Sequence, residues 1–253
     1  VGGAVAMIAV LAYNAMMFGL LGLLGGVASS IFSQFGLTLP WWAWSLIATG
    51  LIGFLGYKEA ELSAKVLLVL VSLEVLIGLV VALAIIGKGG AGQLTYNILD
   101  PQLIFGGGTV AAILFTFGSF IGIEATAIYT EEVRDADRTV PKATFLAIFL
   151  IALFYTFTTW TMVIGTGVDA LVPAIAALPD PTLYLFGLAE QYAGGTVATV
   201  LGILLVTSVF ASAQAMHNFI ARYFYVAGRE GLLPDTLGMT HSDHQSPHVG
   251  SLV

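Results

Sequence analysis

Residues 109–142 read TVAAILFTFGSFIGIEATAIYTEEVRDADRTVPK, and this stretch decides how the rest of the chain is interpreted. Thr109 to Thr130 is 22 residues. A helix of that length is about 33 Å long, which is enough to cross a bilayer. Glu124 lies inside it. A carboxylate at that depth costs at least about 2.5 kcal/mol on insertion scales, so Glu124 is expected to face protein or water and to be functional.

Two glycines precede Glu124 in the segment Gly118-Ser119-Phe120-Ile121-Gly122, and they lower the cost of leaving helical geometry. We therefore predict a discontinuous membrane helix near 109–130. Backbone groups freed in such a turn must line a cavity or meet a ligand. The same Gly-x-x-x-Gly spacing also suits close packing of two continuous helices, and spacing alone does not separate the two interpretations.

The composition places the chain among all-α polytopic membrane proteins. It is 58% hydrophobic and only 9% charged, whereas soluble domains are about 25% charged. Six membrane helices in a single transmembrane domain over 1–253 are predicted. Their approximate bounds are 4–27, 41–56, 63–87, 109–130, 143–166 and 196–227.

The charge balance and the lack of cysteine exclude several classes of partner and site. The net charge of −7 lies almost wholly in the predicted loops, so nucleic acid is not an expected partner. The absence of cysteine excludes disulfides, thiolate metal sites and cysteine nucleophiles. The chain starts at Val1 within an apolar window, where no signal peptide is visible, and ends in what looks like another apolar window. We therefore expect an internal fragment of a longer protein.

Polar side chains inside the predicted helices are the next candidates. Lys65 and Glu74 lie nine residues apart, on opposite faces of one helix, and cannot pair with each other. Lys65 is expected to reach the interface, while Glu74 either bonds a neighbouring helix or belongs to an ion route. Asn14 could bond a substrate or another helix. Ser208 and Ser212 either bond their own helix or act as weak cation ligands.

Two features of the connections bear on topology. Seven of the eight basic residues fall in 57–65, 131–142 and after 217, which six crossings place on one side, the cytoplasmic one. In the long connection 167–195, a short amphipathic helix through Leu183, Phe186 and Leu188 is predicted. Pro141 is expected near the first turn of the fifth membrane helix, where a missing N–H is harmless.

Several motifs resemble the amino acid–polyamine–organocation (APC) permeases. FGSFIGIE at 117–124, Glu131-Glu132 and RTVPKA at 138–143 are similar to the sixth helix and following loop of that family. The segments 217–223 and 228–234 are similar to its eighth helix and the cytoplasmic end of that helix. The resemblance covers the whole chain as helices three to eight of twelve. It implies part of a LeuT-like fold of two inverted five-helix repeats, in a multi-pass protein of the plasma membrane.

The resemblance also implies a binding site at the helix break. Backbone carbonyls near Gly118 to Ile121 would take the ammonium of an amino acid, with Phe120 as an aromatic gate. Lys65 resembles the lysine that replaces a sodium ion in proton-coupled relatives. The expected residues for substrate are Gly118, Ser119, Phe120, Ile121, Gly122, Glu124 and Asn14, and those for the coupling ion are Lys65, Ser208 and Ser212.

The charged segment after the break could form a cytoplasmic gate. Its members would be Glu131, Glu132, Arg134, Arg138 and Arg222. A solvated loop, in which exposed ion pairs contribute about 0–1 kcal/mol, explains the same charges. The chain has Asp135-Ala136 where the family usually has Asn-Pro or Asp-Pro, so this turn is expected to be looser.

The expected function is therefore secondary active transport of an amino acid or related amine by alternating access. Protons are the expected coupling ion, and sodium is the alternative. The alternatives are a membrane channel and an intramembrane enzyme. No catalytic residue, cofactor or metal is predicted. The cluster of His241, Asp243, His244 and His248 has ligand chemistry, but its spacing fits no regular zinc motif.

Overall fold

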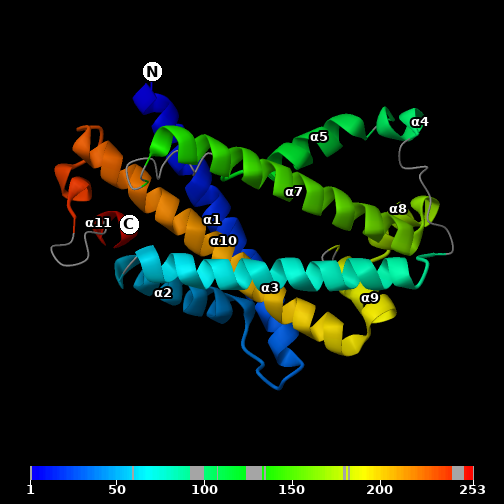
Figure 1. Ribbon diagram of the computed structural model, residues 1–253. Coiled ribbons are helices and arrows are strands. Elements are labelled where there is room, and N and C mark those ends of the chain that lie inside the picture. Colours follow the sequence, from blue (N-terminus) through cyan, green and yellow to red (C-terminus); the bar gives the residue numbers. More distant parts are fainter. Residues whose placement is uncertain are drawn as a thin grey trace. The chain divides into compact units, whose positions relative to one another are not determined.

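A computed structural model describes residues 2–58, 60–91, 100–106, 108–123, 133, 135–178, 181, 183–240 and 248–252. These residues form helices joined by turns and contain no strand (Figure 1). The long helices are α1 (Gly2–Ser33), α2 (Trp41–Lys58), α3 (Ala60–Gly87), α7 (Ala136–Thr166) and α10 (Gly195–Arg229). The short ones are α4 (Pro101–Ile104), α5 (Thr109–Gly118), α8 (Val168–Ala176), α9 (Leu183–Ala193), the 3-10 helix η3 (Asp235–Gly238) and α11 (His248–Leu252).

Four segments of the described chain are long and apolar enough to cross a membrane. They are Gly3–Ser33, Lys65–Gly87, Ala136–Thr166 and Gly195–Arg229. Helices α2 and α5 fall in the predicted windows 41–56 and 109–130 but are not among these four. The chain is therefore helical with several candidate spans, and the count of six stays a prediction.

Helix α7 begins at Ala136, earlier than the predicted start at 143. Asp137 lies in its first turn, where the helix dipole favours an acidic side chain. Pro141 consequently lies inside α7 and not at its first position. The short amphipathic helix predicted through Leu183, Phe186 and Leu188 corresponds to α9, in which Leu188 is buried.

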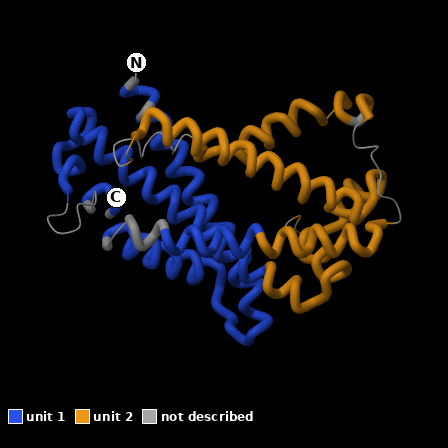
Figure 2. The backbone as a smooth tube through the Cα atoms, viewed as in Figure 1, with its two compact units in different colours: residues 1–75, 202–253 blue, residues 76–201 orange. Residues whose placement is uncertain are grey.

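The chain divides into two compact units (Figure 2). Unit 1 contains residues 1–75 and 202–253, and unit 2 contains residues 76–201. Helices α3 and α10 contribute one part to each unit.

The core of unit 1 is built where α1 and α2 approach closely. A Cβ on Gly25 would collide with the Ser45 hydroxyl oxygen and the Trp41 carbonyl oxygen, so only glycine fits there. Ser45 Oγ donates to the Leu21 carbonyl oxygen at 2.8 Å. The buried residues around this contact, which include two from α10, are Leu21, Leu24, Ala28, Ala48, Ile52, Val209 and Ala213.

A second tight junction in unit 1 joins α2, α10 and α11. The ring of His217 on α10 bonds Ser251 of α11, with 2.8 Å between Nε2 and Oγ. Both groups pack against Gly56 of α2, where a Cβ would lie 2.5 Å from His217 Nε2. Gly250 of α11 is similarly close to α10, because a Cβ placed on Gly250 would lie 2.7 Å from the Ala221 carbonyl oxygen.

Unit 2 is organised around the end of α7. The last carbonyl groups of a helix have no hydrogen-bond donor within it. In α7, groups beyond the helix donate to these carbonyl oxygens. The Gly167 N–H donates to the Val163 carbonyl oxygen at 2.8 Å, and the Ala91 N–H donates to that of Ile164 at 2.9 Å. The Tyr192 hydroxyl donates to the Gly165 carbonyl oxygen at 2.6 Å. The buried residues around it are Val81, Ile85, Ile164, Leu188, Ala189, Tyr192 and Leu201.

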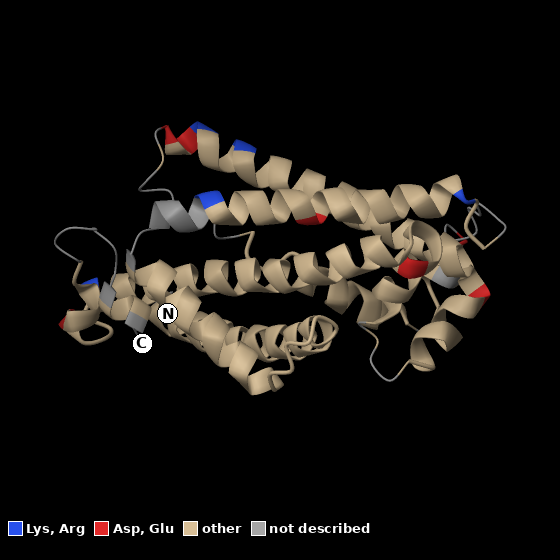
Figure 3. Ribbon diagram, turned by 90° about the horizontal axis from the view of Figure 1, so that it is seen from below, with Lys and Arg blue, Asp and Glu red and all other residues tan. Residues whose placement is uncertain are grey.

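The outward surfaces of the long helices are apolar, with exposed leucine, valine, isoleucine and phenylalanine side chains on α1, α3 and α7. Lys, Arg, Asp and Glu lie mostly at helix ends and in connections (Figure 3). This distribution suits helices that are surrounded by lipid.

Candidate functional site

Regular helical bonding ends at Gly118, where the sequence predicts the break. The Ser119 N–H still donates to the Phe115 carbonyl oxygen at 3.0 Å, four residues back, and shares a second bond to Thr116 at 3.1 Å. The next bonds reach only three residues back: Phe120 to Phe117 at 3.1 Å, Ile121 to Gly118 at 3.3 Å and Ile123 to Phe120 at 3.4 Å. The last two are longer than the usual distance of about 2.9–3.0 Å. The carbonyl oxygens of Gly118 and Phe120 are therefore weakly bonded.

The two glycines of this segment play different roles. Gly122 has a φ of 98°, a backbone conformation that side chains with a Cβ rarely adopt. Gly118 lies in open space, since a Cβ placed on it would meet no described atom within 4 Å. Among the described residues, Gly118 therefore makes no close helix contact, and Gly122 serves a turn.

Phe120 rests on α7 within unit 2. Its ring meets that of Tyr155 edge to face, with centroids 6.2 Å apart. The neighbouring Phe154 packs against α3, where a Cβ on Gly78 would lie 3.1 Å from Phe154 Cζ. The turn after α5 is thus connected to the middle of α7 by an aromatic pair.

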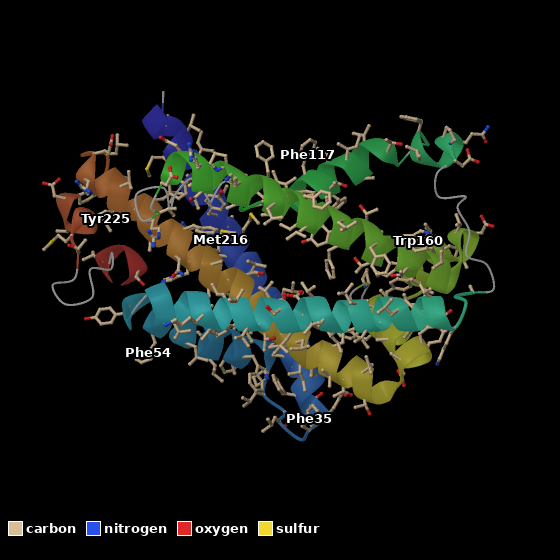
Figure 4. The ribbon with its side chains drawn as sticks, in the orientation of Figure 1. Phe35, Phe54, Phe117, Trp160, Met216 and Tyr225 are labelled. Atoms are coloured by element: carbon tan, nitrogen blue, oxygen red, sulfur yellow. The ribbon has the colours of Figure 1, made fainter. Side chains whose placement is uncertain are left out.

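Helix α5 itself has no buried residue, and Phe115 and Phe117 are 81% and 73% exposed. Phe117 projects away from the helix in Figure 4. The loosened turn is therefore preceded by an apolar helix, and its polar atoms are main-chain carbonyls and the Ser119 hydroxyl, which donates to the Phe115 carbonyl oxygen at 3.1 Å. Carbonyl oxygens of this kind accept hydrogen bonds from an ammonium group.

Some predicted residues lie outside the described part of the chain. These are Glu124 from the substrate set and Glu131, Glu132 and Arg134 from the gate set. His241, Asp243 and His244 are also outside it. The described residues contain no group of three or more histidine, cysteine, aspartate or glutamate side chains that would hold a metal ion.

The predicted residues of unit 1 lie on three helices. Asn14 Nδ2 on α1 donates to the Val10 carbonyl oxygen of its own helix at 2.9 Å. Lys65 on α3 is exposed. On α10, Ser208 is half-buried and Ser212 exposed. Their neighbour Thr207 donates to the Leu204 carbonyl oxygen at 2.8 Å, which is the common bond of a hydroxyl inside a helix.

The two described arginines of the predicted gate belong to different units. Arg138 is exposed in the first turn of α7, and its backbone N–H donates to the Asp135 carbonyl oxygen at 3.2 Å. Arg222 is half-buried on α10. The gate network stays a prediction.

Two polar residues near the predicted candidates did not stand out in the sequence. Tyr155 contacts Phe120, and in the sequence it is one of several hydroxyl-bearing residues from 155 to 161. Gln214 on α10 is 1% exposed and donates from Nε2 to Asn218 Oδ1 at 3.2 Å. Its Oε1 has no partner in the described chain. The sequence signal for Gln214 is an amide that is followed within about one turn by a histidine and an asparagine.

Comparison with known proteins places the chain among transporters. Residues 1–253 match the family described as amino acid permease. The chain is 29% identical over 218 residues to the histidine permease of Lactococcus lactis subsp. cremoris (strain MG1363), covering 80% of this chain and 44% of that protein. It is 28% identical over 137 residues to the low-affinity putrescine importer of Escherichia coli (strain K12), covering 53% of this chain and 29% of the importer.

A third relative is the branched-chain amino acid permease of Bacillus subtilis (strain 168), 25% identical over 201 residues, which are 78% of this chain and 40% of that permease. The matched part is less than half the length of each of these three relatives. The whole-chain match and the apolar helices make this a membrane protein of a transporter family and not of an enzyme family. The resemblance seen in the motifs is confirmed, and the chain belongs to the amino acid permease family.

Proposed function

We propose that this chain is part of a secondary active carrier that moves an amino acid or a related amine across the plasma membrane by alternating access. The named relatives carry histidine, branched-chain amino acids or putrescine. These solutes share an ammonium group. The carrier would have a LeuT-like fold with the break after α5 as part of its binding site.

The observation that carries this proposal is the change in bonding after Gly118. The carbonyl oxygens of Gly118 and Phe120 accept bonds of only 3.3 Å and 3.4 Å from the main chain. Each carbonyl oxygen has two lone pairs, so each retains capacity for an ammonium donor. Phe120, held against Tyr155, would cover the bound solute.

The reconstituted intact protein tests the proposal. In sealed vesicles a carrier gives saturable uptake of a labelled amino acid or amine, and an excess of unlabelled solute inside accelerates entry of the label by counterflow. A mixture of the twenty amino acids and 1,4-diaminobutane serves as the first probe. Absence of counterflow together with single-channel conductance in a planar bilayer would replace the carrier by a channel.

Coupling to protons is proposed through Lys65, and coupling to sodium through Ser208 and Ser212 is the alternative. The support for Lys65 is its resemblance to the lysine that replaces a sodium ion in proton-coupled relatives. Lys65→Ala should abolish uptake driven by a pH gradient while counterflow persists. Lys142→Ala, which removes an exposed lysine from α7, should leave both unchanged. Intact pH-driven uptake in Lys65→Ala would remove Lys65 from the mechanism.

A further inference from the structure

The connection between α1 and α2, residues 34–40, carries no charged residue. The first charge of the whole chain is Lys58, the last residue of α2. By contrast, the segments 58–65 and 228–235 each carry both basic and acidic residues. Helices α1 and α2 both belong to unit 1, so the connection can be described together with the two helices that it joins.

In place of charges, this connection and the start of α2 expose large apolar side chains. Phe35 and Leu37 are 56% and 53% exposed, and Trp41 and Trp42 are 57% and 54% exposed. Phe35 lies on the connection in Figure 4. The apolar surface continues along α2, because Leu46, one turn after Trp42, is 64% exposed. The connection therefore extends the apolar surface that the helices present to lipid.

The main chain of the connection is hydrogen-bonded to α1. The four N–H groups of residues 34–37 donate to carbonyl oxygens in the last turn of α1, at 3.0–3.3 Å. Gly36, with a φ of 82°, allows the helix to end in this way. Ser29 Oγ donates to the Leu39 carbonyl oxygen at 3.0 Å, and Pro40 has no N–H that needs an acceptor. A connection with its main-chain groups bonded in this way can leave bulk water at low cost.

Helix α2 is too short to carry the connection into bulk water. It has 18 residues from Trp41 to Lys58, which span about 27 Å. The hydrocarbon core of a bilayer is about 30 Å thick, and the whole bilayer about 40–45 Å with its headgroup layers. The charged residues from 58 to 61 belong at one membrane surface. Trp41 and Trp42 then reach only the opposite edge of the hydrocarbon core, which is the layer that indole rings prefer.

We propose that the α1–α2 connection lies in the interfacial layer of the membrane, where Phe35, Leu37, Trp41 and Trp42 bind phospholipid. The part of the lipid that they contact is the ester region and the first methylene groups of the acyl chains. Because the surface carries no charge, it takes zwitterionic and anionic phospholipids equally. This inference does not depend on which solute the protein carries.

Fluorescence quenching of the intact protein in phosphatidylcholine vesicles tests the proposal. The emission of Trp41 and Trp42 is the difference between wild type and the double variant Trp41→Phe, Trp42→Phe. A lipid-attached nitroxide near the ester group should remove at least about half of this emission, and iodide in the water less than about a tenth. A nitroxide near the end of the acyl chain should have a smaller effect than the one near the ester group. Replacing part of the phosphatidylcholine with phosphatidylglycerol should change none of these values.

Trp44 is the matched control within the same helix. It is half-buried and stacks on Phe32, with ring centroids 4.8 Å apart. Its emission, obtained from Trp44→Phe, should be quenched less by the nitroxide near the ester group. Strong iodide quenching of Trp41 and Trp42 would place the connection in water and overturn the proposal. Protection from both quenchers would also overturn it, because protein and not lipid would then cover the surface.

A new charge on the connection gives a second test that does not use tryptophan. Leu37→Asp should lower the melting temperature of the protein in vesicles by at least about 3 °C, because a carboxylate is unfavourable in this layer. Met239→Asp alters a side chain of similar exposure, 54%, in a segment that already carries charges. It should leave the melting temperature unchanged, as exposed substitutions in water usually do. Equal melting temperatures for the two variants would contradict the interfacial position of the connection.

Discussion

Phe120 and Tyr155 meet edge to face, with ring centroids 6.2 Å apart and ring planes inclined by 69°. The contact joins the turn after α5 to the middle of α7. Such pairs contribute about 0.5–1.5 kcal/mol beyond the area that they bury. The turn that carries the weakly bonded carbonyl groups of Gly118 and Phe120 is therefore held against α7 through the ring of Phe120.

We predict that Phe120→Ala and Tyr155→Ala are energetically coupled by about 0.5–1.5 kcal/mol. A double-mutant cycle on the unfolding of the purified protein measures this coupling. Phe115→Ala, at an 81% exposed position of α5, supplies the control and should show no coupling to Tyr155→Ala. Additive effects of Phe120→Ala and Tyr155→Ala would contradict the contact.

The two glycines of the turn should respond differently to alanine. Gly122→Ala forces a Cβ onto a backbone with φ of 98°, which costs about 1–2 kcal/mol. Gly118→Ala meets open space, so its stability should stay within about 0.5 kcal/mol of wild type. Unfolding and vesicle uptake of both variants check this. If Gly118→Ala proved the more harmful, close helix packing through the Gly-x-x-x-Gly pair would be the better explanation.

Gly25 and Gly26 form a matched pair on α1. A Cβ at Gly25 would collide with the Trp41 carbonyl oxygen and the Ser45 hydroxyl, whereas a Cβ at Gly26 meets nothing within 4 Å. Gly25→Ala should therefore destabilise the protein by about 1–3 kcal/mol, the usual range for overpacking. Gly26→Ala should be neutral or slightly stabilising, because alanine is the better helix former. Thermal unfolding of both variants gives the answer, and equal effects would contradict the close approach of α1 and α2.

Tyr184 should make the stability of the protein depend on pH in the alkaline range. Burial raises the pKa of Tyr184 above its ordinary value of 10.0, Thr166 lowers it through a hydrogen bond, and Tyr192 adds a smaller upward effect. The folded state then keeps the phenol proton to higher pH than the unfolded state does. The resulting stability is fully present below about pH 10 and is lost as pH rises through the folded pKa.

Tyr184→Phe should therefore lose less stability between about pH 9 and pH 11 than wild type does. At neutral pH the variant should be less stable by about 1 kcal/mol, since it lacks the hydroxyl bonded to Thr166 at 2.6 Å. Melting temperatures across this range provide the measurement. If the melting temperatures of the two proteins fell equally over this range, the loss of stability at alkaline pH would not come from Tyr184.

The sequence predicted those features that follow from local chemistry. The glycine-rich segment 118–122 predicted an interruption close to the residue where α5 ends. The amphipathic pattern through Leu183, Phe186 and Leu188 predicted a short helix where the structure has α9. The start of α7 was predicted too late, because the apolar window begins after the charged first turns that contain Asp137 and Arg138.

Contacts between distant residues were beyond the sequence. Nothing in the chain order brings Tyr155 to Phe120, or Tyr192 to the last turn of α7, because those contacts depend on how helices pack. Asn14 was expected to bond a substrate or another helix, and in the structure its side-chain N–H bonds its own helix. Its role with substrate stays a prediction, as do those of Lys65, Ser208 and Ser212.

Amide hydrogen exchange of the intact protein, with and without saturating solute, tests the central claim most directly. The claim is that the main chain opens after Gly118 to bind an ammonium group. The amides of 119–123 should exchange faster than those within α5 and α7, and the solute that shows counterflow should slow them selectively. Protection of 119–123 equal to that of α7, and unchanged by that solute, would contradict the claim.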